Sequence, residues 1–101
     1  GMQRLARALP PTLRNLNLRE NRIGNLGVEE LAQELSADCC PSLGVLNLAN
    51  NEFGDSGVCA LADAVGHCRD LQYLYLGHNA FGHEGALRLA AALSDGRSEV
   101  L

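Results

Sequence analysis

The sequence contains no lysine and no tryptophan, and aromatic residues make up only 4% of it. Without lysine the chain cannot build a GxxxxGK phosphate-binding loop, so its glycines do not indicate a nucleotide site. No apolar run approaches the roughly 20 residues that a membrane span requires. The net charge of -4 and the lack of a basic stripe argue against nucleic acid. We therefore expect neither a membrane nor a nucleic acid as a partner.

The four cysteines do not form a recognisable disulfide or metal motif. Cys39, Cys40, Cys59 and Cys68 contain neither a CxxC pair nor a zinc-finger spacing. We expect thiols rather than disulfides, and hence a reducing compartment. The cytoplasm is the expected location, and the nucleus is also consistent.

Residues that could carry catalysis or hold a cofactor are scattered along the chain. The histidines His67, His78 and His83 do not share a helix face at ligand spacing, with one another or with Cys68. No serine has a base and an acid in a matching arrangement. We expect no enzyme activity, no metal and no cofactor.

Three segments of the chain repeat one pattern. They are LRNLNLRENRIGNLGVEELAQEL from Leu13, LGVLNLANNEFGDSGVCALADAV from Leu43 and LQYLYLGHNAFGHEGALRLAAAL from Leu71. The second starts 30 residues after the first, and the third starts 28 residues after the second. The shared frame is LxxLxLxxNx(I/F)GxxG(V/A)xxLAxx(L/V), and so many positions in phase indicate a repeat architecture.

This frame resembles the leucine-rich repeat family over essentially the whole chain. Leu43, Leu46, Leu48, Asn51 and Phe53 fit the general LxxLxLxxNxL pattern. The GxxG step and the leucine–alanine helix after it are similar to the ribonuclease-inhibitor-like subclass of intracellular proteins, to which NLR-type receptors belong. The resemblance implies an α/β solenoid. This is a right-handed superhelix of strand–helix units, with a short parallel sheet on the concave side and helices on the convex side.

The hydrophobic period changes inside each repeat. Leu46 and Leu48 lie two residues apart and point to one face of a strand. The apolar residues from Val58 to Val65 instead have helical spacing. Strands stack about 4.8 Å apart and helices about 10 Å apart, so the sheet should line the inner wall of an arc. We predict strands over Asn15–Leu18, Val45–Leu48 and Tyr73–Leu76, and helices over Gly27–Ser36, Gly57–Val65 and Gly85–Leu93.

Positions that recur in each repeat should support the crossing from strand to helix. The first glycine of each GxxG step is expected to permit the turn, and the second to start the helix. Each asparagine after a strand is expected to satisfy backbone groups of the turn. Asp55 or Ser56 is a candidate N-cap for the helix at Gly57. The expected structural residues are Asn21, Asn51, Asn79, Gly24, Gly54 and Gly82.

The ends of the chain also fall within the repeat frame. Residues 1–12 fit the helix of a preceding repeat, residues 13–42, 43–70 and 71–100 are the three repeats, and Leu101 stands where a fourth would begin. We therefore expect residues 1–101 to be one segment of a longer array. The strands at residues 13–18 and 71–76 should lie at sheet edges, which favours end-to-end self-association.

Side chains between the strand leucines should point away from the core and be available for recognition. They form the columns Asn15–Val45–Tyr73 and Asn17–Asn47–Tyr75, followed past the strands by Arg19–Ala49–Gly77 and Glu20–Asn50–His78. Both tyrosines of the chain lie here, and rigid exposed rings favour protein contacts. The predicted partner-binding residues are Tyr73, Tyr75, Asn47, Asn17, Arg19 and His78.

The resemblance implies a non-catalytic protein-interaction module. Such a segment recognises a ligand or holds a larger intracellular protein inactive, as in NLR-type receptors. Two alternatives stay open. One is a regulator resembling the GTPase-activating protein of the Ran cycle, for which Arg19 and Arg22 would supply charge. The other is a structural spacer. The sequence indicates a protein partner and does not identify it.

Overall fold

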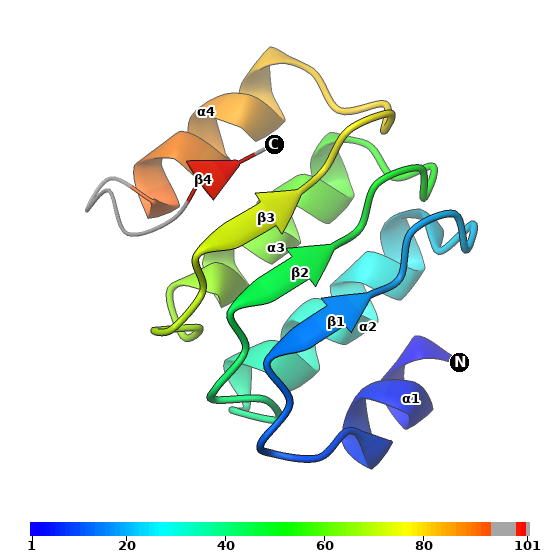
Figure 1. Cartoon of the computed structure of the whole chain (residues 1–101). Helices are drawn as coiled ribbons and strands as arrows, with labels where there is room; N and C mark the ends of the chain where they lie inside the picture. Colours follow the sequence, from blue (N-terminus) through cyan, green and yellow to red (C-terminus); the bar gives the residue numbers. More distant parts are fainter. Residues whose placement is uncertain (94–98, 101) are drawn as a thin grey trace.

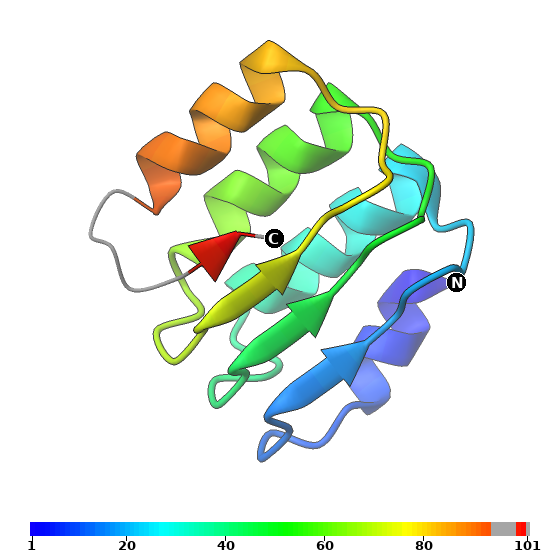
Figure 2. The ribbon, with the colours of Figure 1, turned by 45° about the horizontal axis from the view of Figure 1, so that its top comes forward.

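A computed structural model describes residues 1–93 and 99–100 as two stacked layers, one of strands and one of helices (Figure 1). Each of the first three strands is followed by a helix that lies behind the sheet (Figure 2). In chain order the elements are α1 (Met2–Ala8), β1 (Asn15–Asn17), α2 (Gly24–Ser36), β2 (Val45–Asn47), α3 (Asp55–Val65), β3 (Tyr73–Tyr75), α4 (His83–Ala92) and β4 (Glu99–Val100). The predicted α/β solenoid is confirmed.

The strands pair in parallel, and their order in the sheet follows the chain from β1 to β4. Leu16 pairs with Leu46, and Leu46 pairs with Leu74. Equivalent positions of the three repeats therefore lie side by side across the sheet. The repeat alignment read from the sequence is also the strand register.

Element boundaries differ from the predictions by one to three residues. The first three strands each end one residue early, although the N–H groups of Leu18 and Leu48 still donate to the next strand. The three long helices begin before the second glycine of the GxxG step, at Gly24, Asp55 and His83. The second glycine therefore does not start the helix, as had been predicted, but lies inside its first turn.

Apolar side chains from both layers meet in one core between them. Leu46 from the sheet and Leu31 and Leu61 from the helices are fully buried. Phe53, in the turn after β2, is also fully buried and stacks on Phe81 with ring centroids 6.5 Å apart. Burial of one such side chain contributes about 1.5–3 kcal/mol. The contact between layers is thus the main source of stability, and neighbouring repeats share it.

The C-terminal end of the sheet differs from the prediction. Residue Val100 pairs with Leu74, and Glu99 pairs with Tyr73. A fourth strand therefore covers β3, and the outer strands of the described sheet are β1 and β4. Strand pairing begins before Leu101 because the chain between α4 and β4 is shorter than the one between α3 and β3. Leu101 itself lies outside the described residues.

Helix α1 packs beside α2 at the first end of the array (Figure 1). Its Ala6 is fully buried, whereas Leu5 on the same helix is 41% exposed. Nowhere in residues 1–93 and 99–100 does a helix combine the length and apolarity needed to cross a membrane.

Candidate functional site

The sheet presents one face that no helix covers, and we call its outward side chains the strand face. The register brings Asn15, Val45 and Tyr73 into one column and Asn17, Asn47 and Tyr75 into the next. Tyr73 is 40% exposed, and Tyr75 and Asn47 are half-buried. The outward side chains of β1 to β3 are amides, rings and one valine, without a formal charge. This surface suits aromatic and hydrogen-bonding contacts with another protein.

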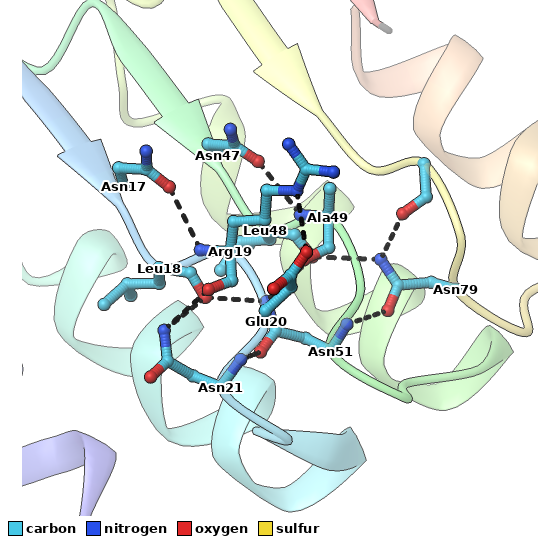
Figure 3. Close-up of polar contacts among 11 residues, drawn as sticks. Asn17, Leu18, Arg19, Glu20, Asn21, Asn47, Leu48, Ala49, Asn51 and Asn79 are labelled. Carbon is cyan, nitrogen blue, oxygen red and sulfur yellow. Dashed lines mark hydrogen bonds and ion pairs between the residues drawn. The ribbon is translucent and has the colours of Figure 1, made fainter.

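Asn17 and Asn47 also stabilise the ends of their own strands. The Oδ1 atom of Asn17 accepts the N–H of Arg19 at 3.1 Å, and the Oδ1 atom of Asn47 accepts the N–H of Ala49 at 3.1 Å (Figure 3). Each is an Asx turn, in which an amide side chain satisfies a backbone donor two residues ahead. The bonds fix the two side chains in parallel orientations. The sequence pattern predicted only a recognition role for Asn17 and Asn47 and gave no sign of this structural one.

A hollow adjoins the strand face at the start of β2. It has a volume of ≈ 420 Å³ and is lined in part by Asn15, Val45 and Gln72. Arg14 and Asp70 also line it, so one charge of each sign lies at its wall. The hollow gives the otherwise flat face a place where a partner's side chain could enter.

The residues just past the strands are more constrained than the sequence indicated. Glu20, Asn50 and His78 occupy one column, and all three have positive φ, at 60°, 57° and 58°. Non-glycine residues reach this left-handed region at a cost of roughly 1–2 kcal/mol, and asparagine tolerates it best. Arg19 is exposed, and its Nε lies 3.5 Å from Oε1 of Glu20. This pair is solvent-exposed, so it contributes little to stability.

Asparagine side chains join the turns of successive repeats (Figure 3). Asn51 is fully buried, and its Oδ1 accepts the N–H groups of Asn21 at 2.9 Å and Ile23 at 3.3 Å in the preceding repeat. Its Nδ2 donates to three carbonyl oxygens, those of Leu18 (2.9 Å), Leu48 (3.0 Å) and Ala49 (3.1 Å). Asn79 repeats the arrangement one turn later, where its Oδ1 accepts the N–H of Asn51 at 2.8 Å. We call Asn21, Asn51 and Asn79 the asparagine column.

A second column, absent from the sequence prediction, caps the helices from the neighbouring repeat. Oδ1 of Asn25 accepts the N–H groups of Gly54 at 2.8 Å and Gly57 at 2.9 Å. Oδ1 of Asp55 accepts those of Gly82 at 2.8 Å and Gly85 at 3.0 Å. The predicted cap was wrong in direction, since Asp55 caps α4 and not its own helix α3. We call Asn25, Asp55 and His83, which share this position of the frame, the cap column.

The glycines of the GxxG step serve two different purposes. Gly24 has φ of 69°, so it meets the predicted need for a special turn conformation. Gly54 and Gly82 have φ of -114° and -115°, so their backbone does not require glycine. At Gly57 an added Cβ would lie 2.8 Å from Oδ1 of Asn25. The second glycine is therefore needed for the close approach of the cap column. The polar residue directly after each first glycine was the sequence signal for that column.

Within residues 1–93 and 99–100, no three histidine, cysteine, aspartate or glutamate side chains gather to hold a metal ion. The four cysteines are present as thiols. Cys39 donates its S–H to Sγ of Cys40 at 3.6 Å. His67 follows α3, His78 follows β3 and His83 begins α4, so the three histidines lie on different parts of the fold.

Comparison with models of protein families gives a match over most of the chain. The family profile described as Leucine Rich repeat matches residues 10–32, 39–62 and 67–90. These three matches coincide with the three strand–turn–helix units. A search of curated proteins finds no match. With most of its length matched, and with parallel strands in register at the repeated leucines, the chain belongs to the leucine-rich repeat family.

Proposed function

We propose that the chain is a non-catalytic module that binds a protein partner through the strand face. The presence of both Tyr73 and Tyr75 on this face carries the proposal. Both project from the same three-residue strand onto an uncharged surface, and Tyr73 is 40% exposed. Aromatic residues at the centre of an interface supply much of its binding energy. Membership of a family of interaction modules supports the same conclusion.

The neighbouring asparagines favour binding by reducing its entropic cost. The Asx turns of Asn17 and Asn47 use the Oδ1 atoms and hold the side chains in place. The two side chains lie beside Tyr75 in the same column, Asn17 exposed and Asn47 half-buried, and their amide N–H groups are not used by the Asx turns. A partner that presents carbonyl groups to these amides would not have to order them first. Arg19 and His78 would lie at the rim of the contact.

The finer proposal concerns the parent protein. The GxxG step and the leucine–alanine helices favour the ribonuclease-inhibitor-like subclass. We propose that the chain is part of a longer array in an intracellular protein, such as an NLR-type receptor, where it recognises a ligand or maintains an inactive state. The cytoplasm is the proposed location. Arg19, which faces Glu20, gives no specific support to a GTPase-regulating role.

Self-association through the first end of the array is a further part of the proposal. Leu5 is 41% exposed and Leu26 is 74% exposed, and both line one hollow of ≈ 410 Å³. Leu18 and Ile23 line the same hollow. The positions that match Leu5, Leu18 and Ile23 one repeat later are Leu31, Leu48 and Phe53, and all three are fully buried. A second copy stacked on this end would therefore continue the same interface, with Leu26 at its edge.

Site-specific photo-crosslinking tests the strand face. A photoreactive amino acid at position 75 should capture a discrete partner from cells, and the same group at position 87 should not. Leu87 is a suitable control because it is 58% exposed on α4, in the helix layer. With the captured protein purified, Tyr75→Ala should weaken binding by about 1–3 kcal/mol, and Leu87→Ala should not. Equal capture at both positions, or unchanged affinity in Tyr75→Ala, would contradict the proposal.

A further inference from the structure

Two thiols lie together at the end of α2, outside the strand face. Cys39 Sγ and Cys40 Sγ are 3.6 Å apart and joined by an S–H hydrogen bond. Cys40 is 2% exposed, whereas Cys39 is half-buried and so partly reachable from solvent. The equivalent positions of the next repeat hold His67 and Cys68, so of the three repeats only the first, residues 13–42, carries adjacent thiols.

The backbone around these thiols is fixed on both sides. The N–H of Asp38 donates to the carbonyl of Leu35 at 3.1 Å, and the N–H of Cys39 donates to that of Glu34 at 3.2 Å. With Asp38 at φ of 60°, these bonds make the Schellman ending of a helix. The carbonyl of Cys40 then accepts the N–H of Leu43 at 3.2 Å. The dithiol is therefore held in place by the fold.

The geometry disfavours a disulfide between the two. Consecutive Cα atoms lie about 3.8 Å apart across a trans peptide, whereas disulfides join Cα atoms about 4.4–6.8 Å apart. A single atom between the sulfurs fits better. With bonds of about 2.3 Å, as for zinc and sulfur, a 3.6 Å separation gives an angle of roughly 100° at the bridging atom. That angle suits a pyramidal or tetrahedral centre.

The surroundings favour a centre that leaves the sulfurs uncharged. Burial, followed by the contact with Cys40 and the charge of Glu34, raises the pKa of the Cys39 thiol to about 12. Zinc requires thiolates and, as a rule, four ligands. Among the described residues no third metal ligand joins this pair. Trivalent arsenic with one organic substituent needs only two sulfurs, and its dithiol product is neutral.

We propose that Cys39 and Cys40 form a binding site for trivalent organic arsenicals. The arsenoxide R–As=O condenses with the two thiols, so that two As–S bonds form and the As=O bond breaks. Both S–H protons leave with the oxygen as one water molecule. Arsenic stays trivalent, and neither oxidant nor reductant is required. A cleft of ≈ 610 Å³, lined by the flanking residues Asp38 and Pro41, offers room for the organic substituent.

Phenylarsine oxide is the probe for this site, added in equimolar amount to the reduced, folded protein. Intact-mass measurement should show one adduct that resists excess glutathione and is removed by 2,3-dimercaptopropanol. Glu-C cleavage after Glu34 and Glu52 isolates residues 35–52, which contain Cys39 and Cys40 and no other cysteine. The adduct should map to this peptide. An adduct on the peptide that carries Cys59 and Cys68 would overturn the proposal.

Cys39→Ser should abolish the glutathione-resistant adduct, since one thiol cannot chelate arsenic. Cys59→Ser is the matched control, because Cys59 is a thiol half-buried to a similar degree, and it should bind as the wild type does. Circular dichroism verifies that both variants are folded. Urea-unfolded chain should bind about ten-fold more weakly, because only the fold positions the two sulfurs in advance. Binding that is unchanged in Cys39→Ser, or equal in the unfolded chain, would refute the site.

Discussion

Asn51→Ala tests whether the asparagine column joins the repeats. The Asn51 side chain is fully buried and makes five hydrogen bonds, two through Oδ1 and three through Nδ2. Alanine removes all five and leaves two N–H groups and three carbonyl groups of the turns without this partner. Water can reach only part of the network, since Asn21 is exposed but Leu48 is buried.

The expected loss follows from these bonds. A net contribution of about 1 kcal/mol for each hydrogen bond gives about 5 kcal/mol as an upper figure. Rehydration near Asn21 lowers it, so we expect the free energy of unfolding to fall by about 3–5 kcal/mol. A typical domain has about 5–15 kcal/mol in total. A loss of this size is characteristic of a disrupted buried network rather than a surface change.

Urea unfolding followed by far-UV circular dichroism measures this loss, and an unchanged m value shows that the same reaction is compared. Asn21→Ala is the control, because the Asn21 side chain is exposed and donates only to the carbonyls of Leu18 and Arg19. It should lose about 1 kcal/mol or less. If Asn51→Ala lowered the free energy of unfolding no more than Asn21→Ala does, each asparagine would stabilise only its own turn. The proposed connection between repeats would then be wrong.

Three further outcomes are expected. Asp55→Ala removes the cap of α4 and should lower the free energy of unfolding, measured in urea, by about 1 kcal/mol. Asp55→Asn should keep most of that stability, because Asn25 makes the same cap one repeat earlier. If both variants lost the same free energy of unfolding, the cap would be contradicted. Leu26→Lys should change stability by less than about 0.5 kcal/mol, since this side chain is 74% exposed, yet reduce self-association in light scattering; unchanged scattering would locate the contact elsewhere. Because burial raises the pKa of Cys39 from 9.0 to about 12, its contribution to stability is full below pH 9 and is lost as pH rises toward 12. The urea midpoint should fall over that range, and a fall equally steep in Cys39→Ser would assign it to other groups.

The fold was predictable because its core depends on repeated apolar positions. Leu16, Leu46 and Leu74 occupy one place in the frame and lie side by side in the sheet. The register of the strands could therefore be predicted without knowing the geometry of the loops. The fourth strand was placed wrongly because Val100 falls out of phase with the repeat, after a shorter connection.

The polar interactions were harder to predict, because a side chain does not reveal from its own position which repeat it serves. Asp55 lies in the first turn of α3 and would ordinarily cap that helix, yet it bonds to the start of α4. Asn17 and Asn47 alternate with leucine, as recognition residues would, and also close turns. For the strand face, sequence alone gives the columns, and the exposure of each member depends on its neighbours.

The two polar columns determine how such an array can grow or shrink. The asparagine column serves the preceding repeat, and the cap column serves the following one. Whole repeats can thus be duplicated or deleted without redesign, because the bonds of the two columns that cross from one repeat to the next connect equivalent positions. His83 is the exception, since a neutral imidazole offers one acceptor nitrogen where Asn25 and Asp55 offer an oxygen with two lone pairs. A helix stacked beyond α4 would receive one bond instead of two, so its start would be held less firmly than the starts of α3 and α4.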